Sequence, residues 1–460
     1  MNTVANLTTR VEKLVGSDRV RASETALQEF AIAGRAPLAV LKPRSAEEVA
    51  EIVSFAAAEK LTVVPCGSRS KLELGMPPQR YDLALDMIDI RQIAHYDPGD
   101  LTLSVDAGIP ISELTATLAG ERQFLPLAVP FNATSTVAGA IASGIDSALR
   151  QQYGPPRDFL IGAEFADSTG KLCKSGGRVV KNVTGYDLHK LLIGSLGTLG
   201  VITRLNFRTF PLPELQGAHL ATFPTMETAL NFHASLLKSG LPFSNLELFD
   251  SEFSVLLAVT LDKLGGSASG SLTTGGWHVF ASFEGSAAVL ERIARELRKL
   301  AGQAQAAHNE TLDLQRTQLM NEALREAFDW LRRAAPGVGL LRIVLPQIRS
   351  GDVTQLLNLS QPAPLRSAFV LRACNVAYLA LLVDTEDAST KTALERGVSE
   401  LSSRVEAAKG SATLLHAPLW LKDRINVWGA KRPDFALMQR VKQAFDPQNI
   451  FAPGRFVGGI

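Results

Sequence analysis

Three stretches of this sequence combine small residues with polar side chains, a composition typical of backbone that binds a ligand. The first, GRVVKNVTGYDLHKLLIGSLGTLGVIT, spans residues 177–203 and contains five glycines. Glycine at this density lets the backbone turn sharply or approach another group closely. Between its apolar runs lies a polar patch made by Lys181, Asn182, Thr184, Tyr186 and Asp187. A core segment would not need this patch, whereas a ligand with polar edges and a flat face would.

The other two stretches lie earlier in the chain. VVPCGSRSKLELG (63–75) follows an apolar run, and free N–H groups after a strand can bind phosphate oxygens. A tight turn carrying solvated Arg69 and Lys71 would look the same. Neither GxxxxGK[ST] nor GxGxxG occurs in the chain, which excludes a P-loop and a Rossmann fingerprint. PFNATSTVAGAIASG (130–144) permits close approach of a ligand, or close packing of a small-residue helix on a sheet.

Composition excludes several classes of protein. A net charge of +1 provides no electrostatic footprint for nucleic acid or an acidic membrane. Cys66, Cys173 and Cys374 are far apart, and the seven histidines form no HxH, HExxH or HxxxH pattern. We therefore expect no iron–sulfur cluster, disulfide framework or dedicated metal site. No apolar run reaches the roughly 18 residues of a membrane span, and the N-terminus lacks an apolar signal core, which predicts a cytoplasmic protein.

The elements that must position these stretches alternate between strand, loop and helix over about 36–212. A helix is predicted over 45–60, with Ser45 as N-cap and Glu48 completing a capping box. A short strand over 61–65 leads into the first loop, further short strands follow up to about 129, and 111–120 is predicted to be a helix. The pattern favours an α+β or α/β fold, and 460 residues predict two or three domains.

The pattern changes after the prolines of FPLPE (210–214), which indicate a domain boundary. A strand at 219–223, a helix at 226–240 and strands around LELFD and SVLLAVT are expected next, then a strand at 277–285 and another helix. A similar set recurs in LLRIVLP, SAFVLRA, YLALLVD and a helix over about 388–408. Two such units predict an antiparallel sheet with helices on one face.

Together the three stretches resemble the FAD-binding domain of the vanillyl-alcohol-oxidase and p-cresol-methylhydroxylase superfamily. VKNVTGYDLHKLLIGSLGTLGVIT is specific to the branch that oxidises 2-hydroxy acids, and the likeness extends to DPQNIFAPGRF near the C-terminus. The resemblance implies an α+β protein with a two-subdomain FAD-binding domain of p-cresol-methylhydroxylase (PCMH) type and a ferredoxin-like antiparallel-sheet cap. The expected domains are a helical segment (1–33), the FAD domain (34–212), a substrate or interaction cap (213–430) and a return segment (431–460).

The resemblance also implies which residues bind FAD. The loop after the first strand would take the pyrophosphate, although Ser68 and Arg69 stand where relatives usually have glycine. The small-residue stretch would line the flavin and its phosphates, VKNVTGYDL would wrap the isoalloxazine, GTLGVIT would lie near the adenosine, and the C-terminal residues would approach the flavin from the cap side. The implied residues are Pro65, Cys66, Gly67, Ser68, Arg69, Ser70, Lys71, Thr136, Val137, Ala138, Gly139, Ser143, Gly144, Lys181, Asn182, Gly185, Tyr186, Asp187, Gly197, Gly200, Val201, Ile202, Asn449 and Arg455.

Departures from the family pattern narrow the expected function. No histidine occurs between residues 1 and 94, so a noncovalent FAD is expected. The chain has GSLGTLG, with Leu196 in place of an acid, and no HxGDGNxH-like metal motif. Both features are similar to the FAD-binding E-type subunits of bacterial glycolate oxidase. That similarity implies a D-type flavoprotein and an iron–sulfur F-type subunit as partners. Through these partners the chain would be peripheral to the inner membrane.

Oxidation of glycolate to glyoxylate needs a base for the hydroxyl proton and a cation for the carboxylate. Arg342 interrupts an apolar strand and is the candidate cation, although an arginine on an edge strand facing water fits equally well. His416 is the candidate base, although a core or surface histidine has the same signature. Two other functions stay open: a free-standing dehydrogenase for D-lactate or another 2-hydroxy acid, and a non-catalytic subunit that carries FAD.

Overall fold

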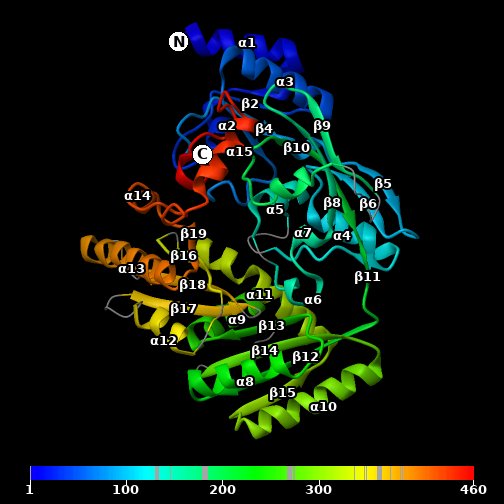
Figure 1. The fold of residues 1–460 in the computed structure, drawn as a ribbon, viewed down its shortest axis with the longest axis vertical. Helices are drawn as coiled ribbons and strands as arrows, with labels where there is room; N and C mark the ends of the chain where they lie inside the picture. The colour runs from blue at the N-terminus through cyan, green and yellow to red at the C-terminus, as the bar shows by residue number, and fades with distance from the viewer. Residues whose placement is uncertain are drawn as a thin grey trace.

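A computed structural model describes residues 2–460 apart from 130–133, 146, 179–184, 267–271, 273–274, 336, 347, 349, 360–364, 373–374, 384 and 386. The described chain folds into two parts, stacked one above the other in Figure 1. The part that contains strands β1 to β11 is called the FAD-domain part, after the expectation from the sequence, and the part that contains β12 to β19 is called the cap. The residues after the cap return to the first part, so both chain ends lie on it. No described helix is long and apolar enough to cross a membrane.

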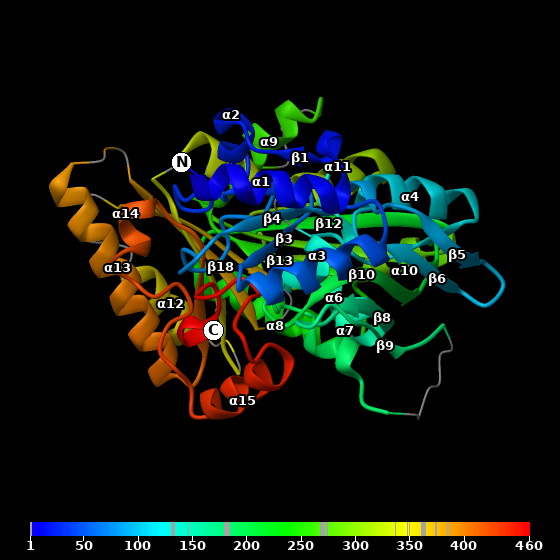
Figure 2. The same cartoon turned by 90° about the horizontal axis from the view of Figure 1, so that it is seen from above.

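The first half of the FAD-domain part is a four-stranded sheet in the order β1-β2-β4-β3. Strands β2, β4 and β3 run parallel, and β1 pairs antiparallel with β2. Figure 2 shows α1 and α3 lying over this sheet. The elements are α1 (Asn2–Val15), β1 (Val20–Arg21), α2 (Glu24–Gln28), β2 (Ala39–Leu41), α3 (Ala46–Glu59), β3 (Val63–Cys66) and β4 (Leu83–Asp86).

The N-terminus of α3 differs in one detail from the predicted capping box. Ser45 Oγ accepts the N–H of Glu48 at 3.2 Å, as expected. The Glu48 carboxylate, however, accepts the Arg44 N–H at 2.9 Å and pairs with Arg19. Arg19, at the end of the 3-10 turn before β1, therefore competes for the Glu48 carboxylate, because a charged partner binds a carboxylate more strongly than a neutral amide does.

The second half is a five-stranded antiparallel sheet in the order β5-β6-β10-β8-β9. Its core is continuous with that of the first sheet and includes Leu103, Phe165 and Phe207. The elements are β5 (Ile93–Asp97), β6 (Thr102–Asp106), α4 (Ile111–Gly120), β7 (Gln123–Phe124), α5 (Val137–Ser143), α6 (Arg150–Tyr153), α7 (Pro156–Phe159), β8 (Leu160–Ala166), β9 (Leu172–Gly176), β10 (Val201–Arg208) and β11 (Phe210–Pro211), which pairs with β7.

The cap is an eight-stranded antiparallel sheet in the order β15-β12-β14-β13-β17-β18-β16-β19. Its strands are β12 (Leu215–Phe223), β13 (Asn245–Phe249), β14 (Trp277–Gly285), β15 (His308–Leu312), β16 (Gly339–Val344), β17 (Leu365–Arg372), β18 (Val376–Val383) and β19 (Ser411–His416). Its helices are α8 (Met226–Lys238), α9 (Ser251–Lys263), α10 (Ala287–Gln303), α11 (Leu314–Ala334), α12 (Ser350–Leu359) and α13 (Ala388–Ala407).

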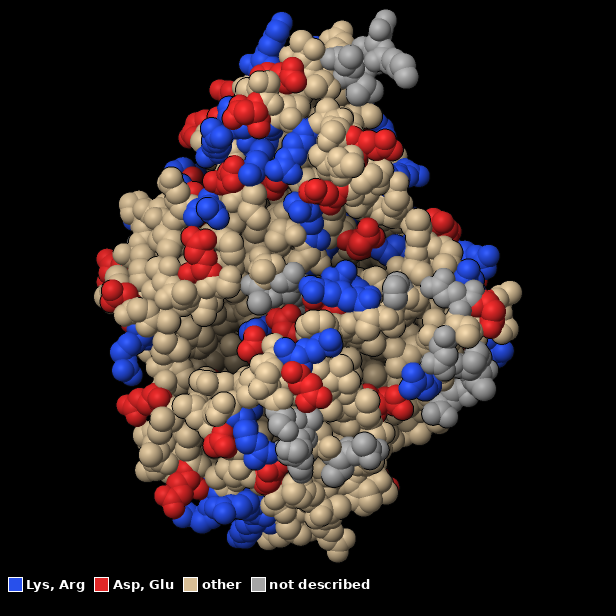
Figure 3. Space-filling model, turned by 180° about the vertical axis from the view of Figure 1, so that it is seen from behind, with Lys and Arg blue, Asp and Glu red and all other residues tan. Residues whose placement is uncertain are grey.

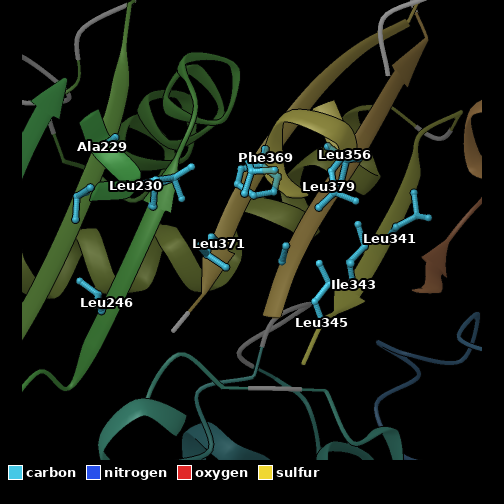
Figure 4. Close-up of a cluster of buried hydrophobic side chains, with 14 of the residues drawn as sticks. Ala229, Leu230, Leu246, Leu341, Ile343, Leu345, Leu356, Phe369, Leu371 and Leu379 are labelled. Carbon is cyan, nitrogen blue, oxygen red and sulfur yellow. The ribbon is translucent and has the colours of Figure 1, made fainter. Parts of the chain in front are cut away.

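Helices cover both faces of the cap sheet, not one face as the sequence pattern predicted. Residues of α8, α10, α12 and α13 share one apolar cluster with alternate strand residues, part of which Figure 4 shows around Leu341, Phe369 and Leu379. Residues of α9 and α11 share a second cluster on the other face, and this cluster also contains Leu74 and Ile145 of the FAD-domain part. The predicted strand SVLLAVT is wrong, since it lies inside α9 and is apolar on most sides.

The chain then returns to the FAD-domain part through α14 (Leu419–Lys422) and α15 (Phe435–Phe445). Phe451 forms a parallel bridge with Val63 of β3. The Val63 N–H donates to Ile450 O at 2.7 Å, and the Ala452 N–H donates to Val63 O at 3.0 Å. Residues more than 380 positions apart in sequence thereby share one sheet edge beside the first glycine loop.

Candidate functional site

The three small-residue stretches meet at one cavity of about 760 Å³, which is partly open to solvent. Figure 3 shows the surface hollowed where the FAD-domain part and the cap meet. The predicted residues that line the cavity are Pro65, Cys66, Gly67, Ser68, Arg69, Ser70, Lys71, Thr136, Ala138, Gly139, Ser143, Gly197, Gly200, Ile202 and Arg455.

The loop after β3 lines the cavity from Cys66 to Leu72. Arg69 has φ of +63°, a left-handed conformation that favours glycine and is uncommon for a long side chain. Its guanidinium lies 4.6 Å from the centre of the Phe30 ring and 3.8 Å from the Glu29 carboxylate. These contacts hold the side chain of Arg69 while its backbone takes a conformation that favours glycine.

Helix α5 presents the second stretch. Thr136 is its N-cap and accepts the Gly139 N–H, and Gly144 ends the helix with φ of +61°. A Cβ atom at Gly139 would meet only Thr136 Oγ1, at 2.9 Å, so its remaining surroundings are open. Glycine here keeps the backbone of α5 bare on the side of the cavity.

The third stretch reaches the cavity through a strained turn before β10. Leu196 has φ of +52° and lines the cavity, and its N–H donates to Ala142 O at 2.9 Å. Gly197 packs so closely on Pro65 that an added Cβ would lie 2.6 Å from its ring. The turn therefore ties α5, the loop after β3 and β10 into one wall.

Two buried or partly buried cations border the cavity. Arg455 is 3% exposed and donates to the carbonyls of Leu72 and Leu74, but its Nε has no hydrogen-bond partner in the described chain. Lys71 Nζ donates to the hydroxyls of Ser70 and Ser135. Burial lowers the pKa of Lys71 to about 8, although Asp329 and Glu326 raise it in part. Cations held this way favour an anionic ligand.

Other predicted residues lie outside this cavity. Val137 and Val201 are fully buried in the domain core. Val137 lies on the core-facing side of α5, and the side chain of Val201 in β10 points to the core face of its sheet. Gly144 lines a neighbouring cavity, and Asn449 lines a separate hollow with Lys60 and Arg80.

The VKNVTGYDL stretch is only partly described. Gly185, Tyr186 and Asp187 do not line the cavity, and Tyr186 is 89% exposed. Lys181 and Asn182 lie outside the described residues.

The two candidate catalytic residues line different cavities. His416 lines a small cavity of about 280 Å³ that shares Ser70 and Lys71 with the large one. Arg342 lines a wider cavity of about 980 Å³ between α5, the cap sheet and the C-terminal segment. The described residues contain no group of three histidine, cysteine or carboxylate side chains able to share a metal ion.

Sequence reasoning missed helix α11, which carries charged groups into this region. Glu326 is 8% exposed and Asp329 is 3% exposed, and the negative charge of each raises the pKa of Lys71. Arg332 of the same helix lines the small cavity beside His416. The signal was present in LREAFDWLRR, where Glu326 and Asp329 fall at helical spacing among apolar residues.

Comparison with known proteins identifies the family. A model described as "FAD binding domain" matches residues 37–176, and one described as "FAD linked oxidases, C-terminal domain" matches 212–358 and 368–456. The chain belongs to the FAD-linked oxidases. This FAD-linked oxidase is a flavin-dependent oxidoreductase, and its cofactor is FAD.

Curated relatives and solved structures agree with this assignment. The "Glycolate oxidase subunit GlcD" of Bacillus subtilis is 23% identical over 91% of this chain and 88% of its own length. The "Glycolate oxidase subunit GlcE" of Escherichia coli is 34% identical over 44% of this chain and 57% of its own length. The structure of p-cresol methylhydroxylase with substrate bound has a TM-score of 0.79 and 16% identity, covering 99% and 97% of the two chains. The FAD-linked oxidase therefore has the PCMH-type fold expected from the sequence.

The residues of the large cavity fit FAD. Exposed backbone in the loop after β3 and at α5 suits close approach of a pyrophosphate, while Arg455 supplies positive charge. The unpartnered Arg455 Nε is a buried donor that a ligand oxygen could accept from. Pro65, Cys66, Ala138, Ala142 and Ile202 supply the apolar surface that a ring system needs.

Proposed function

We propose that this chain is the FAD-binding subunit of a complex that oxidises glycolate, or another small 2-hydroxy acid, to the 2-keto acid. The observation that carries the proposal is the meeting of the loop after β3, α5 and the Leu196 turn at one cavity, in a family whose curated relatives include glycolate oxidase subunits. The GSLGTLG run and the missing metal motif support the E-type assignment.

Several residues of this chain have roles in the proposed reaction. FAD, when bound, supplies the two-electron acceptor for the hydride that leaves the α carbon. We assign the hydroxyl proton to His416, because it lines a cavity that adjoins the cofactor cavity. Leu74, Ile145 and Leu415 line the same space and exclude water from the reacting carbon. Arg342, the sequence candidate for the carboxylate, lines the wider cavity and not the cavity that His416 lines.

Electrons must then leave the reduced cofactor. We propose transfer to a D-type flavoprotein and an iron–sulfur F-type subunit, since this chain has no closely spaced cysteines. Cys66 is buried in the cavity wall, where burial raises the pKa of its thiol to about 12 and keeps it unreactive.

A second candidate, a free-standing dehydrogenase for D-lactate or a related acid, is favoured by the cap. The cap matches its family model over 212–358 and 368–456, and the GlcD likeness runs through 91% of the chain. A chain with a complete cap can bind substrate without a partner.

Purification of the full chain alone, under anaerobic conditions, separates these functions. Loss of the oxidised-flavin absorbance on adding glycolate supports catalysis by this chain, and comparison with D-lactate and D-2-hydroxyglutarate ranks the substrates. Flavin that stays oxidised until the partner subunits are added supports a subunit that carries FAD without catalysing. The proposed function is contradicted if none of these 2-hydroxy acids reduces the flavin, either in the chain alone or after the partner subunits are added.

A further inference from the structure

The small cavity beside the cofactor cavity has the charge of a carboxylate site. It is lined by two cations, Lys71 and Arg332, with His416 and an apolar wall of Leu74, Ile145 and Leu415. We propose that Lys71 and Arg332 bind the carboxylate of the hydroxy acid in this cavity, in place of the sequence candidate Arg342. This inference rests on the proposed function for the identity of the acid.

Lys71 occupies the junction of the two cavities. It lines both, and its ammonium donates to Ser70 and Ser135 hydroxyls, while no described carboxylate lies within 4 Å of its Nζ. Asp329 and Glu326 act on this ammonium only from a greater distance, so its charge is compensated only in part. An anion bound at this junction would supply the missing partner.

Arg332 reaches the same cavity from α11. One of its terminal nitrogens donates to Asp329 Oδ1 at 2.7 Å, but its buried Nε has no hydrogen-bond partner among the described residues. Asp329 is shared with Arg333, which lies 2.5 Å from Oδ2. One carboxylate thus serves two guanidinium groups, which leaves positive charge at the cavity.

The remaining acids near the cavity have partners of their own. Glu326 pairs with Arg325 at 2.9 Å. Glu73 lines the cavity, but its carboxylate accepts the Ala33 N–H at 3.3 Å and lies 3.6 Å from Lys422. Neither acid forms an ion pair with Lys71 or Arg332 in the described chain, and Arg332 lowers the pKa of Lys71 by like-charge repulsion, which an anion between the two would relieve.

The arrangement also orients the substrate. A carboxylate between Lys71 and Arg332 places the adjoining carbon against Leu74, Ile145 and Leu415, which also line the wider cavity. His416 lines the same space and can reach the hydroxyl of that carbon. Arg342 lines a cavity that contains neither Lys71 nor His416, so we do not assign it to the carboxylate of this anion.

The test uses oxalate, a planar diacid that cannot be oxidised by loss of an α hydrogen, and the purified full chain with FAD bound. Binding is followed by the change in the visible spectrum of the oxidised flavin. Arg332→Gln and, separately, Lys71→Met are each expected to weaken oxalate binding at least tenfold. Arg333→Gln is the matched control, since Arg333 pairs with the same Asp329 but does not line the cavity, and should change binding less than twofold. The same variants are titrated with glycolate, where the half-saturating concentration should rise in parallel.

The outcomes separate the two claims. If wild type is bleached by a 2-hydroxy acid but both variants bind oxalate as tightly as wild type, the carboxylate site is wrong and the proposed function stands. If oxalate binding depends on Arg332 and Lys71 but no 2-hydroxy acid bleaches the flavin, even after the partner subunits are added, the anion site stands and the proposed function fails. Wild type that binds no oxalate overturns the site. FAD content and circular dichroism verify that each variant is folded, and the two variants lie on different elements, so one misfolded protein leaves the other to decide.

Discussion

Lys422 and Arg455 bind alternate carbonyls of one four-residue stretch. Lys422 Nζ donates to the carbonyls of Glu73 and Gly75, and Arg455 donates to those of Leu72 and Leu74. Both cations come from the C-terminal part of the chain, and the stretch continues directly from the loop that lines the cofactor cavity. The course of that loop is therefore fixed by residues about 350 to 380 positions later in sequence.

Replacing Arg455 by methionine should loosen this loop and weaken FAD binding. The change removes two hydrogen bonds from a charged donor, each worth about 1.5–3 kcal/mol, and leaves two carbonyls without that donor. We expect a loss of at least about 2 kcal/mol in unfolding free energy and a lower FAD-to-protein ratio after gel filtration. Arg440→Met, on the exposed face of α15, is the control. Full FAD occupancy in Arg455→Met would show that the loop holds its shape unaided.

Valine at Gly139 should block FAD uptake. A branched side chain would extend into the space around α5 that the backbone leaves open, where only Thr136 Oγ1 lies near. We expect apoprotein with near-wild-type circular dichroism and FAD affinity reduced more than tenfold. Gly302→Val places the same side chain in the open on α10 and should keep its flavin. Equal flavin content in the two variants would refute the placement of the cofactor beside Gly139.

The stretches that meet at the large cavity could be singled out in the sequence because glycine and proline report on local backbone geometry. The loop at 65–71 and the turn at Gly197 could be recognised since close approach of backbone excludes side chains at those positions. Helix α9 could not, because an apolar run of seven residues has no period that separates a buried strand from a buried helix. Arg332 was missed for a different reason: its role depends on which helix packs over Lys71, and tertiary packing decides that.

The buried pair of Glu247 and Arg372 in the cap should show strong coupling. Their atoms lie 2.7 Å apart on neighbouring strands, and the side chains are 0% and 2% exposed. Arg372→Met leaves the carboxylate buried without its partner and should cost about 3–5 kcal/mol. The double variant with Glu247→Leu should recover much of that loss in urea unfolding. Additive effects of the two single changes would contradict a direct interaction.

The stability of the cap should fall in mild acid because of His219. Burial lowers the pKa of His219 to about 4. The nearby Arg298 and His308 lower this pKa further, and the carboxylate of Glu310 raises it in part. Between pH 6.5 and 4 the unfolded chain binds a proton that the folded chain does not, so stability drops as pH falls, by up to about 1.4 kcal/mol per pH unit. Urea midpoints of His219→Gln should depend less on pH in this window. His95→Gln, exposed on β5, should follow wild type, and an unchanged slope in His219→Gln would rule this histidine out.

The bridge between Phe451 and Val63 has a consequence for synthesis of the protein. The edge of β3 beside the glycine loop is completed only by residues 450–452. A ribosome working at about 5–20 residues per second makes the roughly 250 residues between β10 and that bridge in about 13–50 s. For that time the nascent domain has a glycine loop without the C-terminal residues that hold it, so we expect cofactor loading to follow release of the chain.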